Sequence, residues 1–158
     1  MPISVTRFSG SFRDDQGNEH QISPPQALRQ RGPVLTATLT LSDRQQQAEA
    51  ASGRGSRSVS GSVLIDTGAS QTCVDQQAAN ELGLTIFGTG RMTSASHSDV
   101  EVPLFVGKIV LPNITINVEG AMGAQLEEQG LIALIGRDLL QNAVLVYNGV
   151  DGSVTLST

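Results

Sequence analysis

Short segments in which apolar side chains alternate with small or polar ones recur along this chain, and they limit the possible folds more than any other feature. The clearest is VLTATLTL, residues 34–41, and similar alternation follows in residues 59–66, 100–111 and 113–122. A period of two places every second side chain on the same face, which is typical of half-buried β-strands. The aromatic fraction is only 3% and Trp is absent. The core therefore has to be built from Val, Ile, Leu and Ala, which also favours strands.

Three further patterns complete the predicted fold. The run LIALIG, residues 131–136, is apolar throughout and predicts a strand covered on both faces. Residues 75–84 and 137–142 each predict a short helix, the first of them capped by Asp75. The chain closes with a predicted hairpin over residues 143–158. About seven to nine strands with two short helices predict an all-β barrel or sandwich.

Composition divides the chain into parts. Residues 1–33 are polar and turn-rich, so we expect an N-terminal arm with a hairpin around DDQGNEH and an irregular connection over SPPQALRQRGP. Residues 34–158 are predicted to form one domain of ordinary size. Within that domain, residues 42–57 lack large apolar side chains and are predicted to be a mobile loop. Its DRQQQAEAA portion could form a transient helix.

Charge and composition exclude several classes of function. The formal net charge is −5 and Lys and Arg form no cluster, so the sequence predicts no nucleic-acid surface. No apolar run approaches the roughly 20 residues of a membrane span, and the N-terminus lacks the apolar core of a signal peptide. We therefore expect a cytoplasmic protein without a membrane partner. The single Cys73 cannot form an intrachain disulfide and is predicted to be a buried structural thiol.

In the stretch VLIDTGASQTCVD, residues 63–75, a short apolar run ends at a carboxylate. Asp66 is followed directly by Thr67 and Gly68. Two interpretations fit this pattern. Asp66 can simply cap a turn, because Asp, Thr and Gly all favour turns. Alternatively, the carboxylate is placed there for chemistry, since a charge at the end of a buried strand is costly unless something satisfies it.

Together with a second motif, this stretch resembles the retropepsin-like aspartic proteases, the single-domain proteases of retroviruses and their cellular and bacterial relatives. In that family an apolar strand delivers the catalytic Asp into a D-T-G loop, as VLIDTGAS does here. A later apolar strand ends in Gly and leads into a short helix, which LIALIGRDLL, residues 131–140, matches. The resemblance covers roughly residues 34–156 and is stronger to the bacterial and cellular branch. It implies a closed β-barrel subunit with one or two short helices, active as a two-fold dimer.

By this resemblance Asp66 is the catalytic residue, in an active-site loop formed with Thr67, Gly68, Ala69 and Ser70. Two carboxyl groups about 3 Å apart share one proton in such enzymes. The chain contains no second D-[TS]-G, so we expect a homodimer that brings two copies of Asp66 together. The expected reaction is cleavage of extended, largely apolar peptide segments by a water molecule that the two carboxyls activate. Because Ala69 cannot donate a hydrogen bond to the carboxylate, we expect a mildly acidic pH optimum.

The hairpin around RMTSASHSDVEV corresponds to the flap that covers substrate in this family. The resemblance therefore implies substrate contacts from Thr93, Ser94, Ala95, Ser96, His97 and Ser98. His97 is interpreted as a solvated loop residue, because the other histidine, His20, lies in the arm and the sequence has no Cys/His cluster. We accordingly expect no metal ion and no organic cofactor.

The second motif is expected to support the catalytic loop through Ile135, Gly136, Arg137 and Asp138. By resemblance, Arg137 anchors the short helix against that loop. Viral enzymes pair this arginine with a carboxylate two residues after the Gly of the triplet, where this chain has Ser70. Asp138 is interpreted as a helix N-terminal charge and not as a second catalytic acid, because no D-T-G loop surrounds it.

Two other functions stay open at this point. The chain could be a peptide-binding module that keeps the fold without the activity, because fold does not determine function. It could also be a plain structural β domain in which Asp66 is only a turn residue. Ser70 and the absence of a Gly-rich flap tip leave room for the binding module.

Overall fold

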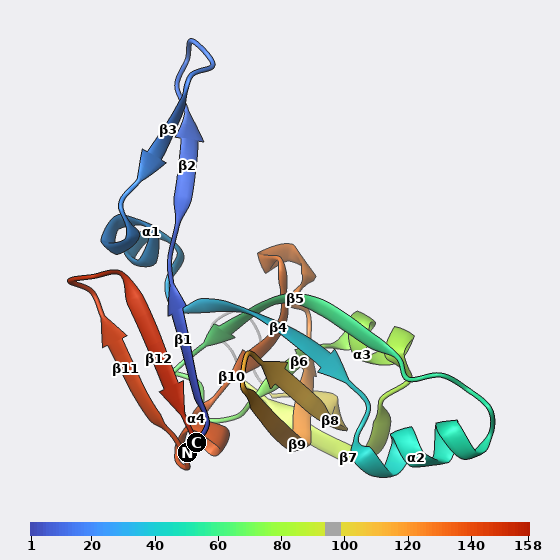
Figure 1. The fold of residues 1–158 in the computed structure, drawn as a ribbon. Coiled ribbons are helices and arrows are strands. Elements are labelled where there is room, and N and C mark those ends of the chain that lie inside the picture. The colour runs from blue at the N-terminus through green and yellow to red at the C-terminus, as the bar shows by residue number, and fades with distance from the viewer. Residues whose placement is uncertain (94–98) are drawn as a thin grey trace.

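Six strands close into a β-barrel in the computed structural model, which describes residues 1–93 and 99–158 (Figure 1). Around the barrel the order is β4 (Val34–Thr40), β5 (Ser58–Ile65), β10 (Leu131–Ile135), β6 (Cys73–Asp75), β9 (Ile114–Ala124) and β8 (Val100–Leu111). The barrel closes because β8 pairs with β4 as well as with β9. β7 (Thr85–Met92) pairs with the other end of β8. The predicted closed barrel of mostly β structure is confirmed.

The barrel interior is built from the small aliphatic side chains that the alternation predicted. Val63 and Ile65 on β5 and Ala133 and Ile135 on β10 are at most 2% exposed. Phe105 on β8 is fully buried and is one of the largest side chains in this core. Because each of these side chains removes its apolar surface from water, the barrel is stabilised mainly by the hydrophobic effect.

Pairing between β5 and β10 decides where the two motifs meet. These strands are parallel, with Ile65 opposite Ile135. Parallel strands end at the same edge of a sheet, so the residues that follow them, Asp66 and Gly136, leave the barrel side by side. The backbone N–H of Asp66 donates to the carbonyl of Ile135 at 2.9 Å.

A second, three-stranded antiparallel sheet joins the two ends of the chain. It has the order β1 (Ile3–Arg7), β12 (Ser153–Ser157) and β11 (Val144–Asn148). β11 and β12 form the predicted terminal hairpin, and both chain ends lie at the same end of this sheet (Figure 1). We call it the terminal sheet. It packs its buried Val154 and Leu156 against the barrel core.

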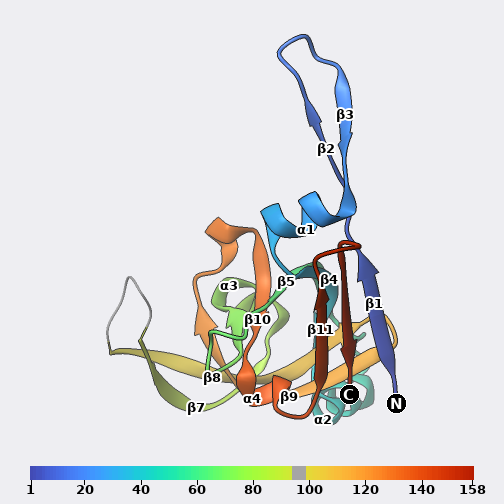
Figure 2. The same ribbon diagram turned by 90° about the vertical axis from the view of Figure 1, so that its left-hand side faces the viewer.

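The arm differs from the prediction in two ways. The expected hairpin is present as β2 (Gly10–Arg13) and β3 (Glu19–Ile22), which form a separate two-stranded sheet within the described part of the chain and project from the body (Figures 1 and 2). However, α1 (Pro24–Arg31) replaces the predicted irregular connection. Proline is tolerated in the first turn of a helix because the N–H groups there have no intrahelical partner. In addition, β1 belongs to the terminal sheet, so residue 33 does not separate an arm from the domain.

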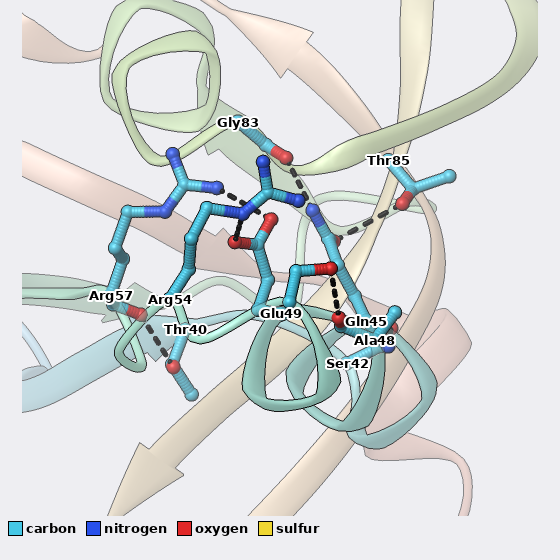
Figure 3. Close-up of polar contacts among 10 residues, drawn as sticks. Thr40, Ser42, Gln45, Ala48, Glu49, Arg54, Arg57, Gly83 and Thr85 are labelled. Carbon is cyan, nitrogen blue, oxygen red and sulfur yellow. Dashed lines mark hydrogen bonds and ion pairs between the residues drawn. The ribbon is translucent and has the colours of Figure 1, made fainter.

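Residues 42–57, predicted to be a mobile loop, contain helix α2 (Asp43–Ala51). This helix has no apolar face, and polar contacts with other parts of the chain hold it in place instead (Figure 3). Glu49 is only 7% exposed, and its carboxylate lies 3.1 Å from Arg57 Nη2 and 2.6 Å from Arg54 Nε, the latter without hydrogen-bond geometry. The side-chain amide of Gln45 donates to the carbonyl of Gly83 at 2.6 Å. The prediction considered composition alone and missed these polar contacts.

We expect Glu49→Gln to destabilise the protein by about 1–2 kcal/mol, because the substitution removes the ion pairs with Arg54 and Arg57. The loss is moderate because both arginines remain partly hydrated. The free energy of unfolding from urea titrations measures this effect. Arg91→Gln is the matched control, because the Arg91–Asp99 pair is exposed on both sides and such pairs contribute about 0–1 kcal/mol. An equal decrease in the free energy of unfolding for the two variants would contradict the stabilising role of Glu49.

Both predicted helices are present. α3 (Gln76–Leu82) begins where the Asp75 carboxylate accepts a hydrogen bond from the N–H of Ala78, at 3.2 Å. It ends at Gly83, whose φ of 68° lies in the left-handed region that favours glycine. α4 (Arg137–Leu140) follows β10 as predicted. Among the described residues, no helix has both the length and the apolar character needed to cross a membrane.

Candidate active site

Asp66 stands at the mouth of the barrel, immediately after β5. Its side chain is half-buried, whereas Thr67 and Gly68 are exposed. One carboxylate oxygen accepts a hydrogen bond from the N–H of Gly68 at 2.8 Å, and the Asp66 carbonyl accepts from the N–H of Ala69 at 3.2 Å. A tight turn therefore holds the carboxylate against its own loop while leaving it open to solvent.

Thr72 connects this loop to the second motif. Its side chain is completely buried, and its hydroxyl accepts from the N–H of Gly136 at 3.1 Å and donates to the Asp138 carboxylate at 2.8 Å. Gly136 packs directly on the backbone of Gln71, because a Cβ there would lie 2.6 Å from the Gln71 carbonyl group. The loop and α4 thus share one hydrogen-bond network and one close backbone contact.

Arg137 binds the loop backbone instead of a carboxylate. Its Nη1 donates to the carbonyls of Thr67 and Gly68, both at 2.8 Å. The N–H of Arg137 donates to Ala69 O at 3.0 Å, and the N–H of Asp138 donates to Ser70 O at 3.2 Å. These four bonds explain how α4 can hold the loop although Ser70 offers no carboxylate.

A partly exposed apolar cluster adjoins the loop. Its buried members are Ala124, Leu126 and Leu131, and the half-buried side chains packed on them are Val34, Leu64, Cys73, Met92 and Leu134. Leu64 lies two residues before Asp66 on β5, and Met92 ends β7 at the root of the predicted flap. The cluster therefore forms an apolar wall that links the strand before Asp66 to the end of β7.

Cys73 is half-buried in this wall, and not fully buried as predicted. Burial, together with the negative charges of Asp138 and Asp66, raises the pKa of its thiol from the ordinary value of 9.0 to about 11. The thiol is therefore neutral at acidic and neutral pH.

We expect alkylation of Cys73 by iodoacetamide at pH 8 to be at least about 100-fold slower than that of an unperturbed thiol, because only the thiolate reacts. The rate should rise with pH up to about 11, the raised pKa. Mass spectrometry of the chain after timed labelling measures it, with the urea-unfolded chain as control. Equal rates for the folded and unfolded chains at pH 8 would contradict the raised pKa.

The predicted flap lies only partly within the described residues. β7 and β8 pair up to Met92 and Val100, and the ion pair between Arg91 and Asp99, at 2.7 Å, joins the two strands near the tip. Thr93 is exposed. The other predicted flap residues lie outside the described residues, namely Ser94, Ala95, Ser96, His97 and Ser98.

The remaining candidate ligands lie apart from this site. His20 in the β2–β3 hairpin contacts the Asp14 carboxylate at 2.8 Å and stacks on Phe12, with ring centroids 5.1 Å apart. The hydrogen bond from His20, together with bonds from Asn18 and the N–H of Gln16, lowers the pKa of Asp14 to about 2. Asp138 opens α4, as expected of a helix N-terminal charge, and also accepts the bond from Thr72. Within the described part of the chain, no three His, Cys, Asp or Glu residues are grouped to hold a metal ion.

Thr72 is the residue at this site that the sequence analysis missed. A buried threonine six residues after Asp66 carries no motif of its own. The available signal was its setting: Thr72 stands in QTCV, residues 71–74, a short segment in which apolar side chains resume, and a polar side chain buried there needs a hydrogen-bond partner.

Comparison with known proteins identifies the family to which this chain belongs. The model of a family described as "Aspartyl protease" matches residues 38–139, which include the Asp66 loop and the start of α4. Among solved structures, a retropepsin-like aspartic protease from Rickettsia conorii is similar at 14% identity and a TM-score of 0.46, over 99% of this chain and 94% of that chain. No curated protein matches. The family model covers well over half of the chain and confirms the resemblance of the two motifs, so this chain belongs to the aspartyl protease family.

Proposed function

We propose that two copies of this chain form an aspartic endopeptidase in which each copy supplies Asp66. Family membership supports proteolysis in general. The observation that carries the specific proposal is the Asp66 loop itself. Its carboxylate is solvent-accessible, yet the loop is held by bonds from Arg137 to the backbone of Thr67 and Gly68. This loop supplies one positioned carboxylate, whereas an aspartic dyad needs two. A second copy of the chain would supply the other.

The chemistry requires both halves. When two carboxyl groups lie about 3 Å apart, only one of them can ionise near neutral pH. The ionised carboxyl takes a proton from water as the water oxygen bonds to the scissile carbonyl carbon, while the protonated one hydrogen-bonds to the carbonyl oxygen. The C–N bond then breaks as the leaving nitrogen receives a proton from the dyad. A monomer lacks the second carboxyl and is expected to be inactive.

The free edge of β11 is our proposed dimer contact. Among the described residues, β11 pairs with β12 alone, and it begins shortly after α4, so the start of this edge lies near the helix that contacts the Asp66 loop (Figure 2). Its Val144 and Val146 are 59% and 50% exposed. An exposed apolar edge strand is a template for pairing with another chain. Two β11 strands related by a two-fold axis would join the terminal sheets into one antiparallel sheet.

The apolar wall supports extended, largely apolar peptides as substrates. Leu64, Leu134 and Met92 are only partly buried in one chain and belong to the wall that links the strand before Asp66 to the end of β7. Apolar substrate side chains would gain binding energy by burying this surface, at about 25 cal/mol per Å². Backbone hydrogen bonds from the hairpin would then orient the peptide.

Hydrolysis of denatured casein from pH 3 to 8, with the oligomeric state measured in the same buffers by light scattering, tests the proposal. We expect cleavage by the dimer. A folded dimer that binds casein peptides without cleaving them would instead be the peptide-binding module, and a folded monomer under all conditions would contradict the dyad.

Ala69 gives a further prediction about pH. A hydroxyl at this position could donate to the ionised carboxylate and stabilise it, so Ala69→Ser should move the pH optimum of cleavage to lower pH by about 0.5–1 unit. The pH dependence of kcat/KM for a fluorogenic peptide measures the shift. Ala69→Gly is the matched control, because it changes the side chain without adding a donor. An unchanged optimum in Ala69→Ser would refute the argument.

A further inference from the structure

The hydroxyl of Thr72 makes two hydrogen bonds whose direction is fixed. Its oxygen accepts the N–H of Gly136 at 3.1 Å, and it lies 2.8 Å from the Asp138 carboxylate. A hydroxyl has a single proton to donate, and a backbone N–H can only donate. The hydroxyl proton therefore lies on the bond to Asp138. The bonds run in one direction, from the N–H through the hydroxyl to a carboxylate oxygen that carries no proton.

This chain of bonds holds the far end of the Asp66 loop. The loop leaves β5 at Asp66 and returns to the barrel at Thr72, directly before β6. At the first end, the N–H of Asp66 donates to the carbonyl of Ile135 at 2.9 Å. At the second end, the N–H of Asp138 donates to Ser70 O at 3.2 Å, and its carboxylate accepts from Thr72. Both ends of the loop are therefore attached to β10 and α4.

No other side chain shares this task among the described residues. Thr72 and Gly136 are both buried. No ion pair of the described residues includes Asp138, because the neighbouring Arg137 donates to two loop carbonyls instead. A buried N–H without an acceptor is unfavourable. Loss of the hydroxyl would therefore favour a rearrangement of the backbone where the loop meets α4.

The proposed reaction is sensitive to such a rearrangement. Two carboxyl groups that share one proton must lie about 3 Å apart. A misplacement of about 1 Å can lower a rate about 100-fold. Asp66 lies six residues before Thr72 on the loop, and its carboxylate accepts a hydrogen bond from within the loop, from the N–H of Gly68. A displaced loop would carry this carboxylate with it.

We propose that Thr72 and Asp138 are a pair of positioning residues that hold Asp66 in place for the reaction. The inference rests on the proposed function, because it concerns the geometry of the same dyad. It requires a hydroxyl at residue 72 and an acceptor oxygen at residue 138. The charge of Asp138 is not required, since an amide oxygen can accept the same hydrogen bond.

Four single variants and one double variant of the full chain test the pair. Thr72→Ser and Asp138→Asn keep the donor and the acceptor, so kcat for a fluorogenic peptide should stay within about threefold of wild type. Thr72→Val and Asp138→Leu remove them and should each lower kcat at least about tenfold, with KM within about twofold. The double variant Thr72→Val/Asp138→Leu should be no more than about threefold slower than either single one, because it breaks a bond that is already broken.

Amide NMR gives a readout that does not depend on proteolysis. The N–H groups of Gly136 and Gly68 report on the bond to Thr72 and on the bond to the Asp66 carboxylate, respectively. We expect both resonances to shift in Thr72→Val and to stay in place in Thr72→Ser. Thr38→Val is the matched control, because it removes a hydroxyl that bonds to Ser60 between β4 and β5. It should change neither the two resonances nor kcat.

The two readouts separate this inference from the proposed function. If the wild-type dimer does not cleave the peptide, the proposed function fails, and the positioning role is then decided by the Gly68 resonance. An unchanged Gly68 resonance in folded Thr72→Val overturns the inference in either case. Equal losses of kcat in Thr72→Ser and Thr72→Val, or fully additive losses in the double variant, also overturn it. Asp138→Leu decides the outcome if Thr72→Val does not fold, since it breaks the same bond from the side of α4.

Discussion

We expect Asp66→Asn to abolish cleavage of denatured casein, lowering kcat/KM by at least about 10³-fold, because the proposed dyad would lose the carboxylate that activates water. The amide oxygen of Asn can still accept the hydrogen bond that the carboxylate accepts from Gly68 N–H, at 2.8 Å. The variant is therefore expected to fold and dimerise normally. Initial rates of casein hydrolysis at the wild-type optimum, together with light scattering of both proteins, measure the effect.

Asp15→Asn is the matched control, because Asp15 is an exposed carboxylate in the β2–β3 turn, far along the chain from the loop. It removes the same charge and should leave the rate unchanged. Residual cleavage by a pure Asp66→Asn dimer within about tenfold of wild type would mean that another group performs the chemistry.

Gly136→Ala is expected to destabilise the protein by about 3 kcal/mol or more and to lower activity with it. A Cβ at this position would lie 2.6 Å from the carbonyl group of Gln71 and 2.9 Å from the N of Thr72. Both are backbone atoms and cannot rotate away. The backbone of Gly136 itself is extended, with φ of −93°, so the cost is steric and not conformational.

Urea unfolding of Gly136→Ala and of Gly55→Ala separates this cost from the general effect of losing a glycine. Gly55 has no neighbour within 4 Å of the position where a Cβ would be, so its substitution should change the free energy of unfolding by less than about 0.5 kcal/mol. If both variants unfolded at the wild-type urea concentration, the close packing of the loop against α4 would be refuted.

The sequence predicted the elements whose signals are local. The apolar run ending at Asp66 and the helix capped by Asp75 each depend on a few neighbouring residues, and the structure has them where expected. The placement of the two motifs beside each other was likewise predictable, because the resemblance specified it. Parallel pairing of Ile65 with Ile135 is the physical reason for it.

What the sequence did not predict depends on distant contacts. α2 has no apolar stripe and owes its place to Glu49 and its two arginines, a pairing that composition cannot reveal. α1 was missed because two prolines were interpreted as breakers, although proline fits a first helical turn. Arg137 was expected to need a carboxylate at Ser70, and only the folded chain reveals that backbone carbonyls satisfy it.

The most direct test of the account is the activity of mixed dimers. Wild-type and Asp66→Asn chains are unfolded together in equal amounts and refolded, so that subunits combine at random, and casein cleavage is compared with wild type at the same total concentration. If two copies of Asp66 form one dyad, only dimers of two wild-type chains cleave, and activity falls to about one quarter. Activity of about one half would show that each chain works alone, and would contradict the shared dyad.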